Sequence, residues 1–216
     1  MKKIVFVVML YALLIAACKK EHSQTIDNKD EPQVSFDLDG EEVEISYDDG
    51  QANESSVYSF GGYAGNYFGI SSLFKMNGKV NLEITFGTVL TQSTQLTEDV
   101  LVQLIAPGKR VYGSLGAFET HPDLKPGKVE IAYTDKKSVR WCSTQIKEET
   151  SGSGLEIKVI VDQPKSTFNI DKIEKTRLNN GKDSYRIKGN FDCFVYQINS
   201  KAKKKMKGKF IGLIPL

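Results

Sequence analysis

The chain has 216 residues, of which 26% are charged and 40% hydrophobic, and its formal net charge is +2 at pH 7. This length suits one domain, or at most two small ones, and the composition excludes a disordered or fibrous protein. Only two histidines and three cysteines are present, which excludes most zinc-site arrangements. We expect a folded domain that holds no metal and no other cofactor.

The first 17 residues have the pattern of a secretory signal peptide. Two lysines precede an apolar run from Ile4 to Ala17, which is short for a membrane-spanning helix. The run leads into Leu14-Ile15-Ala16-Ala17-Cys18, which resembles the lipobox of bacterial lipoproteins. In that family the signal peptide is cut before the cysteine, whose thiol and new amino group are acylated. The resemblance implies a palmitate-type lipid anchor on Cys18. The alternative is an ordinary secretory signal followed by a chance cysteine.

Residues 18–32 predict a flexible tether between the lipid anchor and the folded domain. This segment is polar, has Ile26 as its one aliphatic residue, and ends at Pro32. Lys19-Lys20-Glu21 loosely resembles the charged export signals of surface lipoproteins in Bacteroidota, although those contain several acidic residues in a row. We therefore expect a protein anchored in the outer membrane that faces either the periplasm or the cell surface.

Residues 33–216 predict a single β domain, because apolar and polar residues alternate in most segments. The first two runs, 34–38 and 43–47, are separated by Asp39-Gly40, a dipeptide typical of hairpin turns. Many short strands with turn-forming residues between them are typical of an antiparallel two-sheet β-sandwich. Further strands are predicted at Tyr67–Phe74, Val80–Phe86, Val129–Thr134, Val139–Ser143, Leu155–Val161, Thr167–Glu174, Tyr185–Ile198 and Lys205–Ile214.

One segment, 97–106, departs from this alternation and predicts a single short helix. Its apolar residues Val100, Leu101, Leu104 and Ile105 fall on one helical face. Thr97 suits the N-cap, two acidic residues follow it, and Pro107-Gly108 ends the segment. We expect this helix to cover one edge or end of the sandwich.

The order of these elements resembles that of uncharacterised outer-membrane lipoproteins of Bacteroidota. The matching segments are Phe36–Gly40, Leu96–Gly108, Gly189–Cys193 and Gly208–Phe210. The resemblance implies a lipid-anchored β-sandwich domain in the cell envelope, and it supplies no catalytic residues.

With Cys18 acylated, Cys142 and Cys193 remain as an even pair in an oxidising compartment. Each lies in a predicted strand, so we predict a disulfide between them, with two buried free thiols as the alternative. A catalytic thiol is disfavoured because no histidine lies nearby in the sequence. His121 lies in a predicted loop before Pro122, and without a Gly-x-Ser-x-Gly turn it does not indicate a hydrolase.

An aromatic and glycine-rich stretch, 58–68, allows two interpretations. Tyr58, Tyr63 and Tyr67, together with Trp141, would form a platform for sugar rings if their faces were exposed. The alternative, which we favour, is a strand and loop whose aromatic residues enter the core.

Acidic residues gather at the start of the domain, where residues 33–54 hold eight carboxylates and no lysine or arginine. The spacing lacks the pattern of an EF-hand loop, so we favour a hairpin whose Asp37, Glu42 and Glu44 face solvent over a calcium site. A pair of glycosidase carboxylates stays open, because it depends on a distance across a cleft.

Lysines gather at the end of the domain. Lys203, Lys205, Lys207 and Lys209 occupy alternate positions, so a strand would place four positive charges on one face. This face would bind anions such as lipid headgroups or acidic polysaccharides, or it would keep a sheet edge from pairing with another chain. We favour protection of the edge. The two lysines of the signal peptide account for the whole net charge of +2, so we expect no nucleic-acid partner.

These observations predict a membrane-anchored envelope lipoprotein that binds or scaffolds rather than catalyses. Its expected partners are the membrane, through the lipid anchor, and a polysaccharide or an envelope protein. The alternative function is a carbohydrate-binding accessory lipoprotein of a glycan-capture system.

Overall fold

The computed structural model describes residues 31–46, 55–62, 65–76, 79–90, 97–114, 127–151, 154–178, 181–198 and 200–216. Residues Pro32–Leu216 group into one compact unit. The predicted signal peptide, Cys18, nearly all of the tether, Tyr63 and His121 lie outside the described residues.

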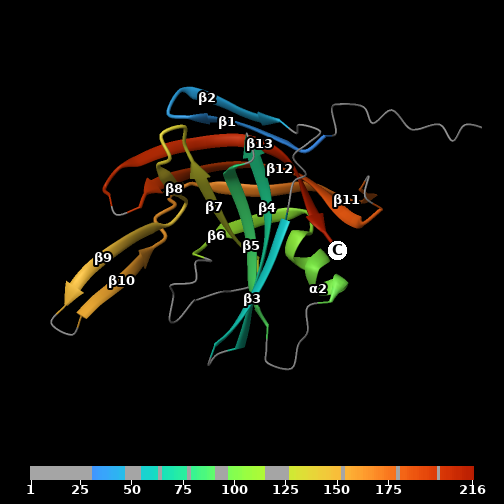
Figure 1. Ribbon diagram of the computed structural model, residues 1–216, viewed down its shortest axis with the longest axis horizontal. Coiled ribbons are helices and arrows are strands. Elements are labelled where there is room, and N and C mark those ends of the chain that lie inside the picture. Colours follow the sequence, from blue (N-terminus) through green and yellow to red (C-terminus); the bar gives the residue numbers. More distant parts are fainter. Residues whose placement is uncertain are drawn as a thin grey trace, which may run out of the picture. The chain divides into compact units, whose positions relative to one another are not determined.

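The described part of the chain is mainly β, as predicted, and contains one α-helix (Figure 1). Its elements are β1 (Gln33–Leu38), β2 (Glu41–Ser46), β3 (Ser55–Gly62), β4 (Gly65–Met76), β5 (Lys79–Leu90), α2 (Glu98–Ile105), β6 (Gly108–Tyr112), β7 (Lys128–Thr134), β8 (Arg140–Cys142), β9 (Gln145–Ser151), β10 (Gly154–Ile160), β11 (Thr167–Arg177), β12 (Asp183–Gln197) and β13 (Lys203–Pro215).

The strands do not form two separate antiparallel sheets, so the predicted two-sheet sandwich is not confirmed. Eleven strands belong to one hydrogen-bonded sheet in the order β2-β1-β13-β12-β11-β6-β7-β5-β4-β3, with β8 attached to both β12 and β7. The ring β12-β11-β6-β7-β8 therefore closes on itself. The sheet is mixed because β6 and β7 run parallel. A parallel pair needs a crossover of about a dozen residues or more, and the chain from Tyr112 to Lys128 is long enough to supply it.

Aromatic side chains from distant strands fill the space that this sheet encloses. Phe36 of β1 meets Tyr133 of β7 edge to face, with ring centroids 5.1 Å apart. Phe168 of β11 lies 5.8 Å from Phe86 of β5 and 5.4 Å from Phe210 of β13. All five side chains are buried. These contacts join strands that are far apart in the sheet order, so its two halves pack against each other across one core.

Two positions of β13 require glycine, because atoms of neighbouring strands lie too close for a side chain. A Cβ on Gly212 would lie 2.4 Å from the hydroxyl oxygen of Ser72 in β4. A Cβ on Gly208 would lie 2.4 Å from the backbone oxygen of Ser35 and 2.5 Å from the Cβ of Phe36. Side chains at either position would push β13 away from its neighbours.

The predicted helix is confirmed, and its two ends are capped. The Thr97 hydroxyl accepts a hydrogen bond from the Val100 amide at 3.4 Å. Leu101, Leu104 and Ile105 are buried against the sheet. The Arg110 guanidinium donates to the carbonyl oxygens of Leu104 and Ala106, which supplies partners at the C-terminal end. This helix, the one that the structure describes, is too short to cross a membrane.

The sequence pattern missed two strands, β6 and β9. β6 begins at Gly108, where we expected only the end of the helix, because its five residues are too few for a clear alternation. β9 is rich in charged residues, which hide any alternation. In both cases, pairing with a neighbouring strand overrides weak local preference. β3 lies in the glycine-rich stretch and is the strand that the favoured interpretation of that stretch expected.

Candidate functional site

The first and last strands lie side by side in the sheet. β1 pairs antiparallel with β13, so Asp37 stands opposite Lys207 and Ser35 opposite Lys209. Because β1 also pairs with β2, Asp37 has Glu42 on its other side. The acidic hairpin and the lysine strand, which stand at opposite ends of the domain sequence, therefore form one continuous surface.

Two rows of polar residues cross this surface, one residue from each of five strands. Register places residues of one row directly opposite one another on the same face. The first row is Glu42, Asp37, Lys207, Asp192 and Thr167, and the second is Glu44, Ser35, Lys209, Asn190 and Asn169. We call this surface, with the hollow over it, the polar groove.

The polar groove is open to solvent and has a volume of about 950 Å³. Nine of the ten residues in the two rows line it, Asn169 being the exception. Glu42, Glu44 and Asp37 are exposed, as expected for a solvated hairpin face. Positive, negative and neutral polar groups thus share a concave surface that is large enough for a segment of another molecule.

β13 lies between β1 and β12, so the favoured prediction that its lysines protect a sheet edge is wrong. Nor do the four lysines of β13 form one patch of free positive charge. The Lys203 ammonium lies 3.4 Å from Asp162 Oδ2 and 3.9 Å from the centre of the Phe194 ring. Lys205 pairs with Asp192 and lies over the same ring. Lys207 and Lys209 line the polar groove and make no ion pair with any acidic residue that the structure describes. Two of the four lysines are therefore available to a ligand, with carboxylates close by.

Two carboxylates beside the groove hold the β1–β2 turn. Asp37 Oδ1 accepts from the Gly40 amide at 3.0 Å, and Asp39 Oδ1 accepts from the Lys205 amide at 2.7 Å. Asp39 and Gly40 have φ values of 53° and 89°, the left-handed conformation that this turn requires. Within the described residues, no group of three histidine, cysteine or acidic side chains is arranged to hold a metal ion.

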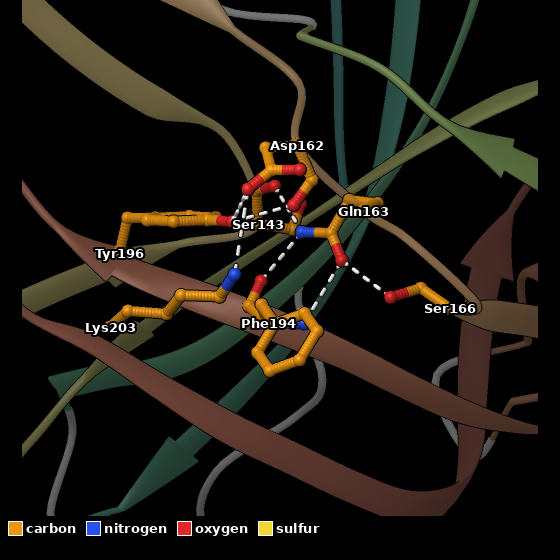
Figure 2. A network of polar contacts seen from close by, with 7 residues as sticks. All are labelled: Ser143, Asp162, Gln163, Ser166, Phe194, Tyr196 and Lys203. Carbon is orange, nitrogen blue, oxygen red and sulfur yellow. Dashed lines mark hydrogen bonds and ion pairs between the residues drawn. The ribbon is translucent and has the colours of Figure 1, made fainter.

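A network of polar contacts adjoins the groove at β12 (Figure 2). β11 pairs with β12 up to Asp192, and β8 pairs with it from Tyr196, which leaves Phe194 without a strand neighbour on that side. The Gln163 side chain fills this gap. Its amide nitrogen donates to the Phe194 carbonyl at 2.6 Å, and its oxygen accepts from the Phe194 amide at 2.9 Å.

The same network fixes the segment that follows β10. Gln163 Nε2 also donates to the Ser143 carbonyl at 2.5 Å, and its oxygen accepts from the Ser166 hydroxyl at 2.7 Å. The Tyr196 hydroxyl donates to the Asp162 carbonyl oxygen. Burial, the largest effect, raises the pKa of Tyr196, so this hydroxyl stays protonated at neutral pH. The network joins the residue after β8, the segment after β10 and strand β12, and its role is structural.

Cys142 and Cys193 are free and buried, so the predicted disulfide is not present in the structure. Register gives the reason. Cys142 stands opposite Tyr196, and Cys193 is three residues away along β12, about 10 Å at the usual strand rise. An odd separation also puts the two cysteines on opposite faces of the sheet, whereas a disulfide needs Cα atoms within about 7 Å. Burial raises the pKa of the Cys142 thiol to about 11 and that of Cys193 to about 12. Neither thiol is a nucleophile at neutral pH.

The aromatic platform is not assembled from the four residues predicted. Trp141 is 5% exposed and belongs to the core. Its indole nitrogen donates to Asp135 Oδ2 at 3.2 Å, and Lys204 lies over its ring. The side chains of Tyr58 and Tyr67, and the whole of Tyr63, lie outside the described residues. The backbone register places Tyr58 opposite Gly69 and Tyr67 opposite Phe60.

Sequence reasoning missed part of the polar groove. Asn190, Asp192 and Thr167 belong to strands that we predicted, but nothing in the sequence tied them to the acidic hairpin or to the lysines. The one available signal was the alternation of polar residues along β12, which marks an exposed face. Comparison with protein-family models, curated proteins and solved structures gives no match to this chain.

Proposed function

We propose that this protein is a bacterial lipoprotein, anchored in the outer membrane through Cys18, whose β domain is a non-catalytic interaction module. The polar groove is its binding surface. The mixed charge of five adjacent strands carries this proposal, because Lys207 and Lys209 share one open hollow with Asp37, Glu42 and Glu44. Such a surface offers a partner carboxylates on β1 and β2 and ammonium groups on β13.

Two features of the described residues support binding rather than catalysis. The two thiols are buried with raised pKa values. The Asp162–Tyr196–Lys203 network is engaged in holding the fold. Nucleophilic and acid–base catalysis need activated groups that reach a substrate, whereas the two thiols are protonated and the residues of this network are occupied.

Lipid attachment is tested separately from binding. Cells that express the full chain are labelled with radioactive palmitate, and a Cys18→Ala variant serves as the control. We expect label in the wild type alone, together with cleavage of the signal peptide. Equal labelling of both proteins, or an uncleaved and unlabelled wild type, would refute the anchor.

The binding role is tested by photo-crosslinking in cells. A photoreactive amino acid replaces Glu44 in the polar groove or, as the matched control, Lys137 in the exposed turn between β7 and β8. We expect adducts of higher mass from position 44 and none from position 137. Adducts from both positions, or from neither, would contradict a specific binding surface.

The chemistry of the groove also favours carbohydrate binding as a second function. Carboxylates and ammonium groups (Glu42, Glu44 and Lys209 among them) suit the adjacent hydroxyls of a sugar, which both donate and accept hydrogen bonds. Calorimetry with soluble xylan, β-glucan, mannan and polygalacturonate tests this function. We expect a neutral polysaccharide to bind, and Lys209→Ala to weaken the binding at least about tenfold while Lys137→Ala does not. Binding of polygalacturonate alone would instead favour an anion site, and no binding at all would remove this second function.

A further inference from the structure

The hairpin β9–β10 forms a sheet of its own. Every residue of β10 pairs with β9, from Gly154 opposite Ser151 to Ile160 opposite Gln145, and the pair is not hydrogen-bonded into the larger sheet. Figure 1 shows the two strands as an arm beside that sheet. An isolated two-stranded hairpin is marginally stable in water, so the arm gains from a further strand along its edge.

Both ends of the arm are fixed to the main sheet. Before β9, the Ser143 amide donates to the Ile131 carbonyl at 2.8 Å, and its hydroxyl accepts from the Ile131 amide at 2.9 Å. After β10, Gln163 and Asp162 are held in the network of Figure 2. The arm is therefore presented by a rigid base.

Both strands of the arm have a free edge, and that of β10 is the side facing away from β9. Ser151 and Gly154 are the last pair before the two-residue connection, so they exchange backbone hydrogen bonds with each other. Along an antiparallel ladder every second pair does so, which includes Glu149–Glu156 and Lys147–Lys158. Glu156 and Lys158 thus use their backbone groups toward β9. The backbone groups of Leu155, Ile157 and Val159 point the other way, where no strand among the described residues pairs with them.

We propose that two copies of this protein associate through β10, antiparallel and centred on Ile157. This register pairs Ile157 with itself and Leu155 with Val159 of the partner subunit, so the unpaired backbone groups of both edges are satisfied. It also places Lys158 opposite Glu156 of the partner subunit, twice by symmetry. Ile157 is the midpoint of the seven-residue strand, so the two strands overlap over their full length.

Charge decides between this register and its neighbours. Sliding the pair by two residues in one direction puts Glu156 opposite Glu156 of the partner subunit. Sliding it the other way puts Lys158 opposite Lys158 of the partner subunit. Like charges directly opposite each other destabilise a sheet, whereas opposite charges stabilise it. The sequence of β10 is therefore complementary to itself in one register only.

The second copy also compensates like charges within each arm. Lys147 stands opposite Lys158, and Glu149 opposite Glu156, within the hairpin. In the dimer, each row of residues across the four strands holds both charges. The row that begins with Glu149 and Glu156 of one copy ends with Lys158 and Lys147 of the partner subunit. The result is a four-stranded sheet with two mixed-charge rows, which a foreign strand would not reproduce. This inference does not depend on the polar groove.

Charge reversal tests the interface. Sedimentation equilibrium of the full-length lipoprotein in detergent compares the wild type with Lys158→Glu, Glu156→Lys and the double variant. Each single variant sets two like-charge pairs across the interface, so we expect the dissociation constant of the dimer to rise about tenfold or more. The double variant restores opposite charges and should return close to the wild-type value. A monomeric wild type, or a double variant as weak as the single ones, would overturn the proposal.

Disulfide capture tests the register. Ile157→Cys lies opposite itself across the interface, so it should form an intermolecular disulfide in cells, seen as a dimer on a non-reducing gel. Leu155→Cys is the matched control, because its symmetry copy lies about 13 Å away along the strands. Fluorescence of Trp141, which is buried far along the chain from either substitution, confirms that both variants fold. Capture at neither position, or equally at both, would contradict this register.

Discussion

The side chain of Gln163 offers a sharp test of how the sheet is completed at β12. Replacing Gln163 with alanine leaves the amide and carbonyl of Phe194 and the carbonyl of Ser143 without their present partners. An unsatisfied buried polar group costs about 1–3 kcal/mol, and water reaches part of this half-buried site, so we expect a loss of about 2–4 kcal/mol in the free energy of unfolding. For a domain of this size, the loss lowers the melting temperature by roughly 4–16 °C.

Urea unfolding followed by the fluorescence of Trp141 measures this loss, because Trp141 is the one tryptophan and it is buried. Ser166→Ala is the matched control: it removes one hydrogen bond to the same amide and should cost about 1 kcal/mol or less. Gln163→Glu keeps the acceptor for Phe194 but loses both donors, so it should be at least as unstable as the alanine variant. A Gln163→Ala protein within about 0.5 kcal/mol of the wild type would refute this account of β12.

Three further outcomes follow from the described packing. Gly208→Ala should cost about 1–3 kcal/mol in urea unfolding, since its Cβ would meet backbone at 2.4 Å; a neutral change would show that β13 can move. Thr97→Ala should cost about 1 kcal/mol through loss of the N-cap, and an unchanged urea midpoint would contradict that role. Burial raises the pKa of Cys142 from 9.0 to about 11, so the folded state keeps a proton that the unfolded state loses in this range. The unfolding free energy should therefore be at its full value below pH 9 and fall between pH 9 and 11, less steeply in Cys142→Ala. Equal slopes in the two proteins would contradict this assignment.

Most strands and the helix were predictable because their patterns are local. The hairpin at Asp39-Gly40 has its turn residues, and the helix has its N-cap and four apolar residues on one face. The β9 strand, with Lys147, Glu148 and Glu149 in a row, shows no alternation that would reveal it. Its place is decided by its pairing with β10.

The arrangement of the strands was not predictable, and the polar groove depends on it. Whether the acidic hairpin meets the lysine strand is decided by the pairing of β1 with β13, which stand at opposite ends of the domain sequence. The same limit explains the cysteines: their strand positions were predicted correctly, but register separates them along β12. Long-range pairing reflects the packing of the whole core, to which each segment contributes only a part.

Covalent labelling of lysines in intact cell envelopes tests the central claim, that the polar groove binds a partner, most directly. Acetylation of Lys207 and Lys209 by a water-soluble ester is followed by mass spectrometry in envelopes and in the purified protein, with exposed Lys137 as the internal reference. If the groove is occupied, both groove lysines should react several-fold more slowly in envelopes than in the purified protein, while Lys137 reacts equally in both. Equal protection of all three lysines, or protection of none, would contradict a binding role for this surface.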